Sequence, residues 1–308
     1  MKVSLSISIV LLWLCASVLT ACAPHRQTVG TSFREPAFVD QTVIMADAAR
    51  LPLRVWKAEQ PKAIIVAVHG FNDYSNAFEE TGQWFIDRGV TTYAYDQRGF
   101  GGAPVFGSWA GADAMVSDLI SVVALARAAH PNVPLYVLGS SMGGAVTISA
   151  AATGELAVDG VILAAPAIWG WSSMNLLYKS TLWISAHTLP QWTVTGEGVG
   201  RMPSDNIEML RAQWLDPLVI KETRVDTIYG LVGLMDRAYL SIEEVRMPTL
   251  YLYGAKDEIV PRGPTREVVE RSTGNITYTE YPEGWHMLLR DLQRETVWRD
   301  VLEWIDRE

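Results

Sequence analysis

Cysteine is almost absent from this chain. The 308 residues include two, Cys15 and Cys22, and both lie within the first 22 positions. The rest of the chain therefore has no thiol for a disulfide bond, a thiolate zinc site or redox chemistry. We expect neither a metal nor another cofactor.

Positive charge is also scarce. The chain carries 25 Lys and Arg against 34 Asp and Glu, a formal net charge of −9. Such a balance disfavours a phosphate backbone as ligand, so we expect no nucleic-acid partner. With 49% hydrophobic and 19% charged residues, the chain can form one large domain with an insertion. It gives no indication of oligomeric state.

The N-terminus predicts a targeting segment. Lys2 supplies a positive start, and residues 5–19 are apolar or small. The following Leu-Thr-Ala-Cys at 19–22 resembles the bacterial lipobox, in which the signal peptide is cleaved before a cysteine that receives the lipid. An ordinary secretory signal and an uncleaved anchor helix are the alternatives, although the apolar run is short for a membrane span.

The lipobox resemblance implies a signal peptide at 1–21, lipidation of Cys22 and a lipidated tether at 22–38. The polar, aperiodic composition of the tether fits a linker. Ala23, and not aspartate, follows Cys22, as in lipoproteins sorted to an outer membrane. We therefore expect a bacterial envelope protein that is held by its lipid on the outer membrane and faces the periplasm.

Eight short apolar runs predict strands. They lie at 41–45, 53–57, 64–68, 91–95, 135–138, 161–164, 249–253 and 276–281. Segments with helical periodicity separate the later runs, most clearly at 112–130. This alternation predicts an α/β core, residues 39–167 and 243–308, with a mostly parallel sheet covered by helices on both faces.

The alternation stops at 168–242, which predicts a helical cap. Two or three helices fit this insertion, notably at 207–214 and 225–239, and no strand is needed. Between 161 and 196 the only formal charge is Lys179, and four tryptophans share the same stretch. A segment this apolar either packs on the sheet or binds an apolar ligand.

A G-x-S-x-G motif at 139–143 places Ser141 between a predicted strand and a predicted helix. This is the context of a nucleophile elbow, where glycines allow a strained turn to expose the serine. The alternative is a helix start at which Ser140 or Ser141 acts as the N-cap.

A serine nucleophile needs a histidine base and an acid that orients it. Only His187 and His286 follow Ser141, and His187 lies in the insertion, before any candidate acid strand. His286 follows the last predicted strand, where a loop can reach the nucleophile; a surface histidine is the plain alternative. The turn after 249–253 offers two adjacent acids, Asp257 and Glu258.

Backbone N–H groups should stabilise the oxyanion. Met142, directly after the nucleophile, and Phe71, in the loop after strand 64–68, are the expected donors. We interpret His69 as a structural residue of that loop. The charged turn at 96–99 is interpreted as loop scaffolding.

Together these motifs resemble the monoacylglycerol lipase and lysophospholipase branch of the α/β-hydrolases, grouped with the serine aminopeptidases, over residues 40–306. Residues 254–261 resemble the G-x-x-D-x-x-V-P acid loop of that family, which assigns the acid to Asp257. The resemblance implies a cofactor-free ester hydrolase whose cap forms an apolar acyl channel. Ser140, Phe100 and the Asp73–Tyr74 pair depart from common family residues, so the head group stays open.

The function expected is cleavage of a lipid ester, a monoacylglycerol or a lysophospholipid, through an acyl-Ser141 intermediate. One alternative keeps the hydrolase but changes the substrate to short-chain esters, thioesters or peptides. Another is a non-catalytic lipoprotein that binds lipid in the same apolar pocket.

Overall fold

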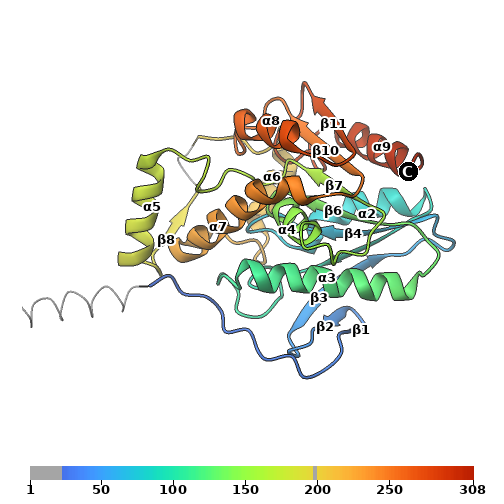
Figure 1. Cartoon of the computed structure of the whole chain (residues 1–308), viewed down its shortest axis with the longest axis horizontal. Coiled ribbons are helices and arrows are strands. Elements are labelled where there is room, and N and C mark those ends of the chain that lie inside the picture. The colour runs from blue at the N-terminus through green and yellow to red at the C-terminus, as the bar shows by residue number, and fades with distance from the viewer. Residues whose placement is uncertain (1–22, 197–199) are drawn as a thin grey trace, which may run out of the picture.

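The computed structural model describes residues 23–196 and 200–308, so the predicted signal peptide and Cys22 lie outside the described residues. A nine-stranded sheet forms the centre, in the order β1-β2-β3-β5-β4-β6-β7-β10-β11 (Figure 1). The strands are β1 (Ala37–Val39), β2 (Thr42–Ile44), β3 (Arg50–Trp56), β4 (Ala63–Val68), β5 (Val90–Tyr95), β6 (Leu135–Ser140), β7 (Gly160–Ala164), β10 (Thr249–Gly254) and β11 (Ile276–Tyr281).

The sheet is mostly parallel, as predicted. From β5 to β11 every neighbouring pair runs parallel, whereas β1, β2 and β3 form an antiparallel edge. All six residues of β4, Ala-Ile-Ile-Val-Ala-Val, are fully buried. A strand that is apolar at every position can be buried only where both faces of the sheet are covered.

Helices cover the two faces. In the described part of the chain the helices are α2 (Glu79–Ile86), α3 (Ala112–Ala129), α4 (Met142–Ala151), α5 (Leu176–Thr188), α6 (Ile207–Leu215), α7 (Val225–Ser241), α8 (Arg262–Arg271) and α9 (Arg294–Ile305), with 3₁₀ turns η1 (Ser75–Phe78) and η2 (Ile242–Glu244). One core cluster joins Ile64 and Val66 to α3 and α4, and the other joins Ile65 to α2 and α9. No helix among the described residues combines the length and apolar character needed to cross a membrane.

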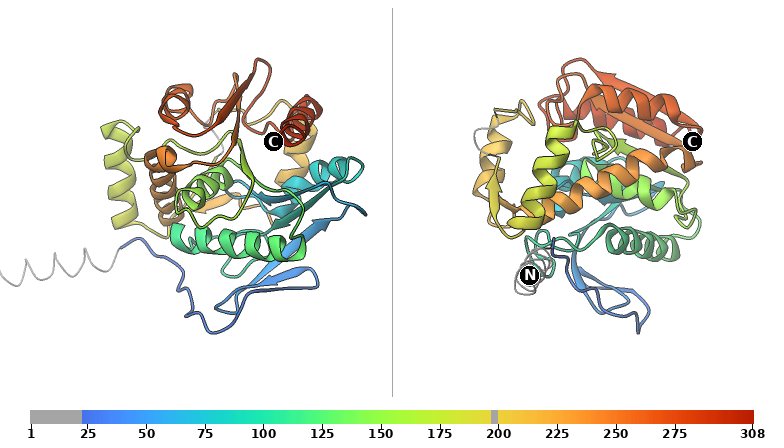
Figure 2. Two further views of the ribbon diagram at one scale, coloured as in Figure 1. Left: turned by 45° about the vertical axis from the view of Figure 1, so that its right-hand side comes forward. Right: turned by 60° about the vertical axis from the view of Figure 1, so that its left-hand side comes forward.

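The structure adds strands at two places. A three-residue strand, β1, pairs antiparallel with β2, so the sheet has one strand more than the eight predicted. Within the insertion, β8 (Thr193–Thr195) and β9 (Glu222–Arg224) form a two-stranded sheet where no strand was expected. The helices α6 and α7 begin at the predicted residues, while α5 completes the cap at the outer edge of the molecule (Figures 1 and 2).

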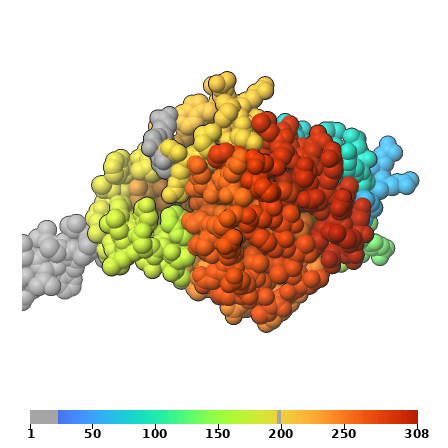
Figure 3. Space-filling model, turned by 90° about the horizontal axis from the view of Figure 1, so that it is seen from above, coloured from blue at the N-terminus to red at the C-terminus, as the bar shows by residue number. Residues whose placement is uncertain are grey.

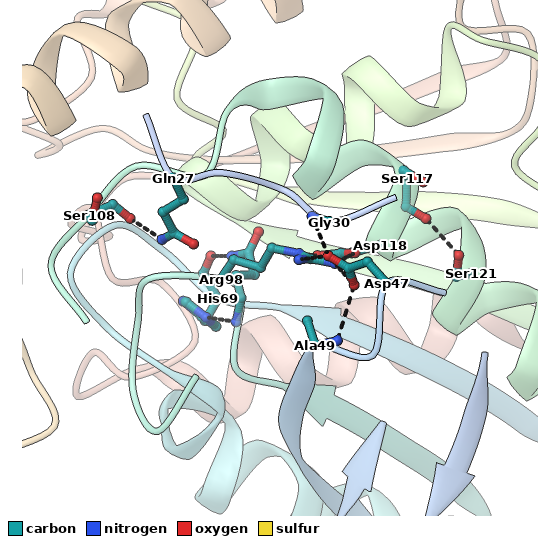
Figure 4. A network of polar contacts seen from close by, with 11 residues as sticks. Gln27, Gly30, Asp47, Ala49, His69, Arg98, Ser108, Ser117, Asp118 and Ser121 are labelled. Carbon is teal, nitrogen blue, oxygen red and sulfur yellow. Dashed lines mark hydrogen bonds and ion pairs between the residues drawn. The ribbon is translucent and has the colours of Figure 1, made fainter. Parts of the chain in front are cut away.

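The segment expected to be a tether lies on the domain surface instead. The Gln27 N–H donates to the Trp109 carbonyl at 2.8 Å, and the Gly30 N–H donates to Asp47 Oδ2 at 3.2 Å (Figure 4). These partners are remote in sequence, so composition alone gave no sign of them. The free linker is therefore shorter than the expected 22–38.

Candidate active site

Ser141 sits at the sharp turn between β6 and α4. Its backbone has φ +50° and ψ −114°, a conformation that costs a non-glycine residue on the order of 1–3 kcal/mol. The surroundings hold it there: its N–H donates to the Ala164 carbonyl at 3.0 Å, and its carbonyl accepts from the Ala167 N–H at 2.9 Å. This turn lifts the Ser141 hydroxyl above the ends of the parallel strands.

The elbow glycines are required by close packing. A Cβ on Gly143 would lie 2.0 Å from the Val68 carbonyl oxygen, and one on Gly139 would lie 2.5 Å from Thr147 Oγ1. Cβ atoms in proteins do not approach other atoms so closely. The Val68 oxygen belongs to the backbone, so it cannot rotate out of the way as a flexible side chain could. The sequence interpretation of these two glycines therefore matches the observed geometry.

Ser141, His286 and Asp257 form one chain of hydrogen bonds. Ser141 Oγ lies 2.9 Å from His286 Nε2, and His286 Nδ1 lies 2.8 Å from Asp257 Oδ2. An ionised carboxylate can only accept, so Nδ1 carries the proton and Nε2 is free to accept the serine proton. The structure thus brings together the three side chains that the sequence selected.

Asp257 is held by its own loop. Its Oδ1 accepts from the Ile259 and Val260 N–H groups at 2.7 and 2.9 Å, and its side chain is fully buried. The neighbouring Glu258 is exposed and accepts from the Met202 N–H at 2.7 Å. Only Asp257 faces the histidine.

The two expected oxyanion donors belong to residues that lie close to the nucleophile. Met142 is the first residue of α4, where N–H groups have no partner within the helix. Phe71 follows Gly70, which lies next to the nucleophile, since a Cβ on Gly70 would be 3.4 Å from Ser141 Cβ. Phe71 also lines the same pocket as Ser141. This arrangement fits the expected oxyanion donors.

His69 and Gln97 fix the loop that carries Phe71. The fully buried His69 ring accepts from the Gln97 N–H at Nε2 (2.9 Å), so its Nδ1 donates to the Gly70 carbonyl (2.8 Å). Gln97 Nε2 in turn donates to the His69 carbonyl at 2.9 Å. Burial lowers the pKa of His69, which favours this neutral form. These contacts are structural.

The charged turn at 96–99 continues this support. Asp96 accepts from the Ser75 and Gly102 N–H groups at 3.0 and 2.8 Å, which ties the turn to its neighbours. Arg98 forms ion pairs with Asp118 (2.6 Å) and Asp47 (2.7 Å), all three nearly buried (Figure 4). Hydrogen bonding to Arg98 lowers the pKa of Asp47. The turn acts as scaffolding.

A pocket of about 240 Å³ opens at Ser141. It is lined mostly by apolar side chains, with Asp73 and Arg290 at its border: Gly70, Phe71, Asp73, Ala77, Phe78, Ser140, Ser141, Pro203, Ile259, His286, Met287, Leu289 and Arg290. Asp73 and Arg290 form a 2.7 Å ion pair and also line a larger neighbouring pocket of about 600 Å³. The apolar pocket at the nucleophile thus adjoins a second, more polar pocket through Asp73 and Arg290.

Sequence reasoning missed Asp291 and Ser204. Asp291 Oδ2 accepts from the N–H of Trp285, which directly precedes His286, at 2.8 Å. Its Oδ1 accepts from Ser204 Oγ of the cap at 2.6 Å. Burial raises the pKa of Asp291. No motif marks this pair, because the two residues meet only in the folded chain.

The other candidates lie elsewhere. His187 is in α5, where it stacks on Trp183 with ring centroids 4.3 Å apart. Cys22 lies outside the described residues. Within the described part of the chain, no three His, Cys, Asp or Glu side chains are grouped as a metal site.

The chain is similar along most of its length to several known proteins. Monoacylglycerol lipase of Mycolicibacterium smegmatis is 26% identical over 265 residues, which cover 83% of this chain and 92% of that protein. Monoglyceride lipase of Rattus norvegicus is 27% identical over 277 residues, covering 85% and 89%. The crystal structure of Paleococcus ferrophilus monoacylglycerol lipase matches with a TM-score of 0.70 at 21% identity, covering 83% of this chain and 98% of that one. A soluble variant of monoglyceride lipase from Saccharomyces cerevisiae matches at 0.72 and 18%, covering 92% and 99%.

The fold and the hydrogen-bonded serine, histidine and aspartate define a serine hydrolase of the α/β-hydrolase class. Within that class, the chain belongs to the family described as serine aminopeptidase, S33, whose model matches residues 59–293.

Proposed function

We propose that this protein hydrolyses a carboxylic ester of lipid type, a monoacylglycerol or a lysophospholipid, through an acyl-Ser141 intermediate. The observation that carries the proposal is the unbroken hydrogen-bond chain from Ser141 through His286 to Asp257 at the mouth of an apolar pocket. The curated relatives named above, which cover most of this chain, support the ester of a lipid over a peptide.

Acylation begins when Ser141 Oγ attacks the ester carbonyl carbon. His286 Nε2 takes the hydroxyl proton, and Asp257 stabilises the resulting imidazolium through Nδ1–H. The Phe71 and Met142 N–H groups stabilise the oxyanion of the tetrahedral intermediate. As the intermediate collapses, the bond to the alcohol oxygen breaks, and His286 returns the proton to that oxygen.

Deacylation repeats these steps with water. His286 Nε2 accepts a proton from water, whose oxygen attacks the acyl carbon, and then returns the proton to Ser141 Oγ as the fatty acid leaves. The apolar lining around Phe71, Phe78 and Leu289 favours a hydrocarbon chain over water. The polar pocket beyond Asp73 and Arg290 gives room for the alcohol part.

We further propose that the enzyme is a lipoprotein anchored through Cys22 to the outer membrane and facing the periplasm. The support is the lipobox-like 19–22 segment and Ala23 after the cysteine. Mass spectrometry of the mature N-terminus tests it: a diacylglyceryl thioether on Cys22 is expected, and an unmodified cysteine contradicts it.

The reaction is tested with Ser141→Ala and, as a matched control, Ser140→Ala on p-nitrophenyl esters of increasing chain length. Ser141→Ala should abolish turnover and labelling by a fluorophosphonate probe, whereas Ser140→Ala should retain labelling. Undiminished turnover by Ser141→Ala would overturn the mechanism. A preference for acetyl over long acyl chains would favour the short-chain alternative, and an unlabelled native protein would favour lipid binding without catalysis.

A further inference from the structure

Cap helix α5 exposes most of its apolar side chains. Of its thirteen residues, only Ala186 is buried. Seven large hydrophobic residues on α5 and just after it are more than half exposed: Leu176 (77%), Leu177 (73%), Tyr178 (51%), Trp183 (51%), Ile184 (54%), Leu189 (54%) and Trp192 (60%). We call this set the α5 face. Contiguous apolar surface of this kind marks a place where something else binds.

The charge of the α5 face suits a lipid surface. The helix carries no acidic residue, and its one formal charge is Lys179. A groove of about 410 Å³ lies along the same helix, lined by Trp171, Lys179, Ser180, Trp183 and Ile184. Indole rings, aliphatic side chains and a lysine are the residue types that bind at the boundary between lipid head groups and acyl chains.

The start of the described chain lies beside this face. Hydrogen bonds connect them in three steps: Gln27 N–H to the Trp109 carbonyl (2.8 Å), Thr227 Oγ1 to the Gly107 carbonyl (3.1 Å), and Val225 N–H to the Trp192 carbonyl (2.9 Å). In the ribbon views the N-terminal segment begins next to β8 and the adjoining end of α5 (Figures 1 and 2). The cap occupies that end of the molecule in the space-filling view (Figure 3).

The distance from anchor to domain is limited. Gln27 is fastened to the 107–109 loop by its N–H and by its side chain, which donates to the Ser108 carbonyl at 2.5 Å (Figure 4). Further along, Gly30 is tied to Asp47, which is ion-paired with the nearly buried Arg98. Four residues lie between Cys22 and Gln27, so the chain makes five residue steps from one to the other and spans at most about 18 Å even when fully extended. A bilayer that holds Cys22 is therefore close to the α5 face.

We propose that the α5 face lies against the membrane to which the chain is anchored, and that the docked segment from Gln27 to Gly30 holds the domain in this orientation. The inference rests on the lipid anchor proposed above. It also places the cap at the membrane that would contain a lipid ester, so the substrate can pass from the bilayer to the active site without crossing the aqueous phase.

Single introduced cysteines can test this orientation, because the chain has no cysteine after Cys22. Full-length protein with Leu177→Cys, on the α5 face, is compared with Val55→Cys, an exposed position on β3. Both are reconstituted in vesicles of phosphatidylethanolamine and phosphatidylglycerol and labelled with an environment-sensitive maleimide dye. Quenching by a doxyl-labelled lipid is then measured. We expect quenching at position 177 to be several-fold stronger than at position 55.

Each outcome has a separate meaning. Equal quenching at the two positions in anchored protein overturns the proposal while leaving the anchor intact. A blue shift at position 177 that depends on protein concentration but not on doxyl lipid also overturns it, since a second copy then covers the face. The parent protein without an introduced cysteine reports on the anchor itself: it should take no label, and labelling at Cys22 shows that the anchor has failed. Circular dichroism of both variants confirms that they are folded.

Discussion

Ser204 of the cap donates a 2.6 Å hydrogen bond to Asp291 of the histidine loop, and both side chains are fully buried. The same carboxylate accepts from the N–H of Trp285, beside His286. The cap is joined to this loop at a second point, where the Met287 N–H donates to the Pro203 carbonyl at 2.9 Å. The position of the histidine base therefore depends on the cap as well as on the core.

Replacing Asp291 should impair both catalysis and stability. In Asp291→Ala the partly buried Trp285 N–H and the buried Ser204 hydroxyl lose their acceptor, which we expect to lower the free energy of unfolding by about 1–3 kcal/mol. A displaced His286 should reduce kcat on the order of 10²-fold. Urea unfolding and ester turnover measure the two effects. Ser204→Ala keeps the contact between Asp291 and the Trp285 N–H and should retain most of kcat. An unchanged kcat in Asp291→Ala would show that the loop keeps His286 in position without this carboxylate.

Asp257→Asn should remove activity without unfolding the protein. The amide oxygen can still accept from the Ile259 and Val260 N–H groups, but its NH₂ then faces His286 Nδ1. The ring must move its proton to Nε2, where it can no longer accept from Ser141. We expect kcat to fall on the order of 10⁴-fold. Glu258→Gln, at the adjacent exposed carboxylate, should be nearly neutral, and a comparable loss there would refute the assignment of the acid.

Gly143→Ala should disrupt the elbow. The added methyl group would lie 2.0 Å from the Val68 carbonyl oxygen, so α4 must shift and displace Ser141. Fluorophosphonate labelling should be lost and thermal stability reduced. Gly233→Ala in α7 is the matched control, since its Cβ meets nothing within 4 Å. Alanine there should stabilise the helix by up to about 1 kcal/mol; normal labelling of Gly143→Ala would contradict the packing argument.

Stability should fall on acidification because of His69. Burial lowers its pKa in the folded protein from the ordinary 6.5, so below that value the unfolded chain binds a proton that the folded chain does not. The free energy of unfolding therefore decreases as the pH falls from 6.5 toward the lowered folded pKa, by up to about 1.4 kcal/mol per pH unit. His69→Gln can still accept from the Gln97 N–H but does not titrate. Urea unfolding at pH values from about one unit above to about one unit below the ordinary histidine pKa should show a shallower pH dependence in this variant; identical slopes would exclude His69 as the source.

The core strands were predictable because burial on both faces leaves continuous apolar runs such as 64–68. The amphipathic helices α6 and α7 were predictable from their periodicity. The pattern did not predict β1, β8 and β9, because a strand of three residues is too short to show alternation of apolar and polar residues. Helix α5 has apolar residues around most of its circumference, so no single buried face was visible in its pattern.

For the site, chain order and local context were enough to select Ser141, Asp257 and His286, and the structure places them within hydrogen-bonding distance. Their catalytic roles stay predictions until the variants above are measured. The Ser204–Asp291 contact could not be found this way, since it joins residues 87 positions apart without a motif. The docking of Gln27 on the 107–109 loop has no motif either, because both acceptors are backbone carbonyl groups, which any residue could supply.

The docked N-terminal segment also determines where the chain can be cut to obtain a soluble enzyme. A version that begins at residue 35 would retain every strand of the sheet and all three catalytic side chains, yet it would lose the Gln27 and Gly30 contacts. Gly30 is a partner of Asp47, and Asp47 in turn pairs with Arg98. Arg98 is next to Gln97, which contacts His69 in the loop that carries Phe71. Removing residues 23–34, which resemble a dispensable linker, would thus take away a contact of the Asp47–Arg98 ion pair and expose it to water. A start at residue 23 avoids this, and any purification tag belongs at the C-terminus.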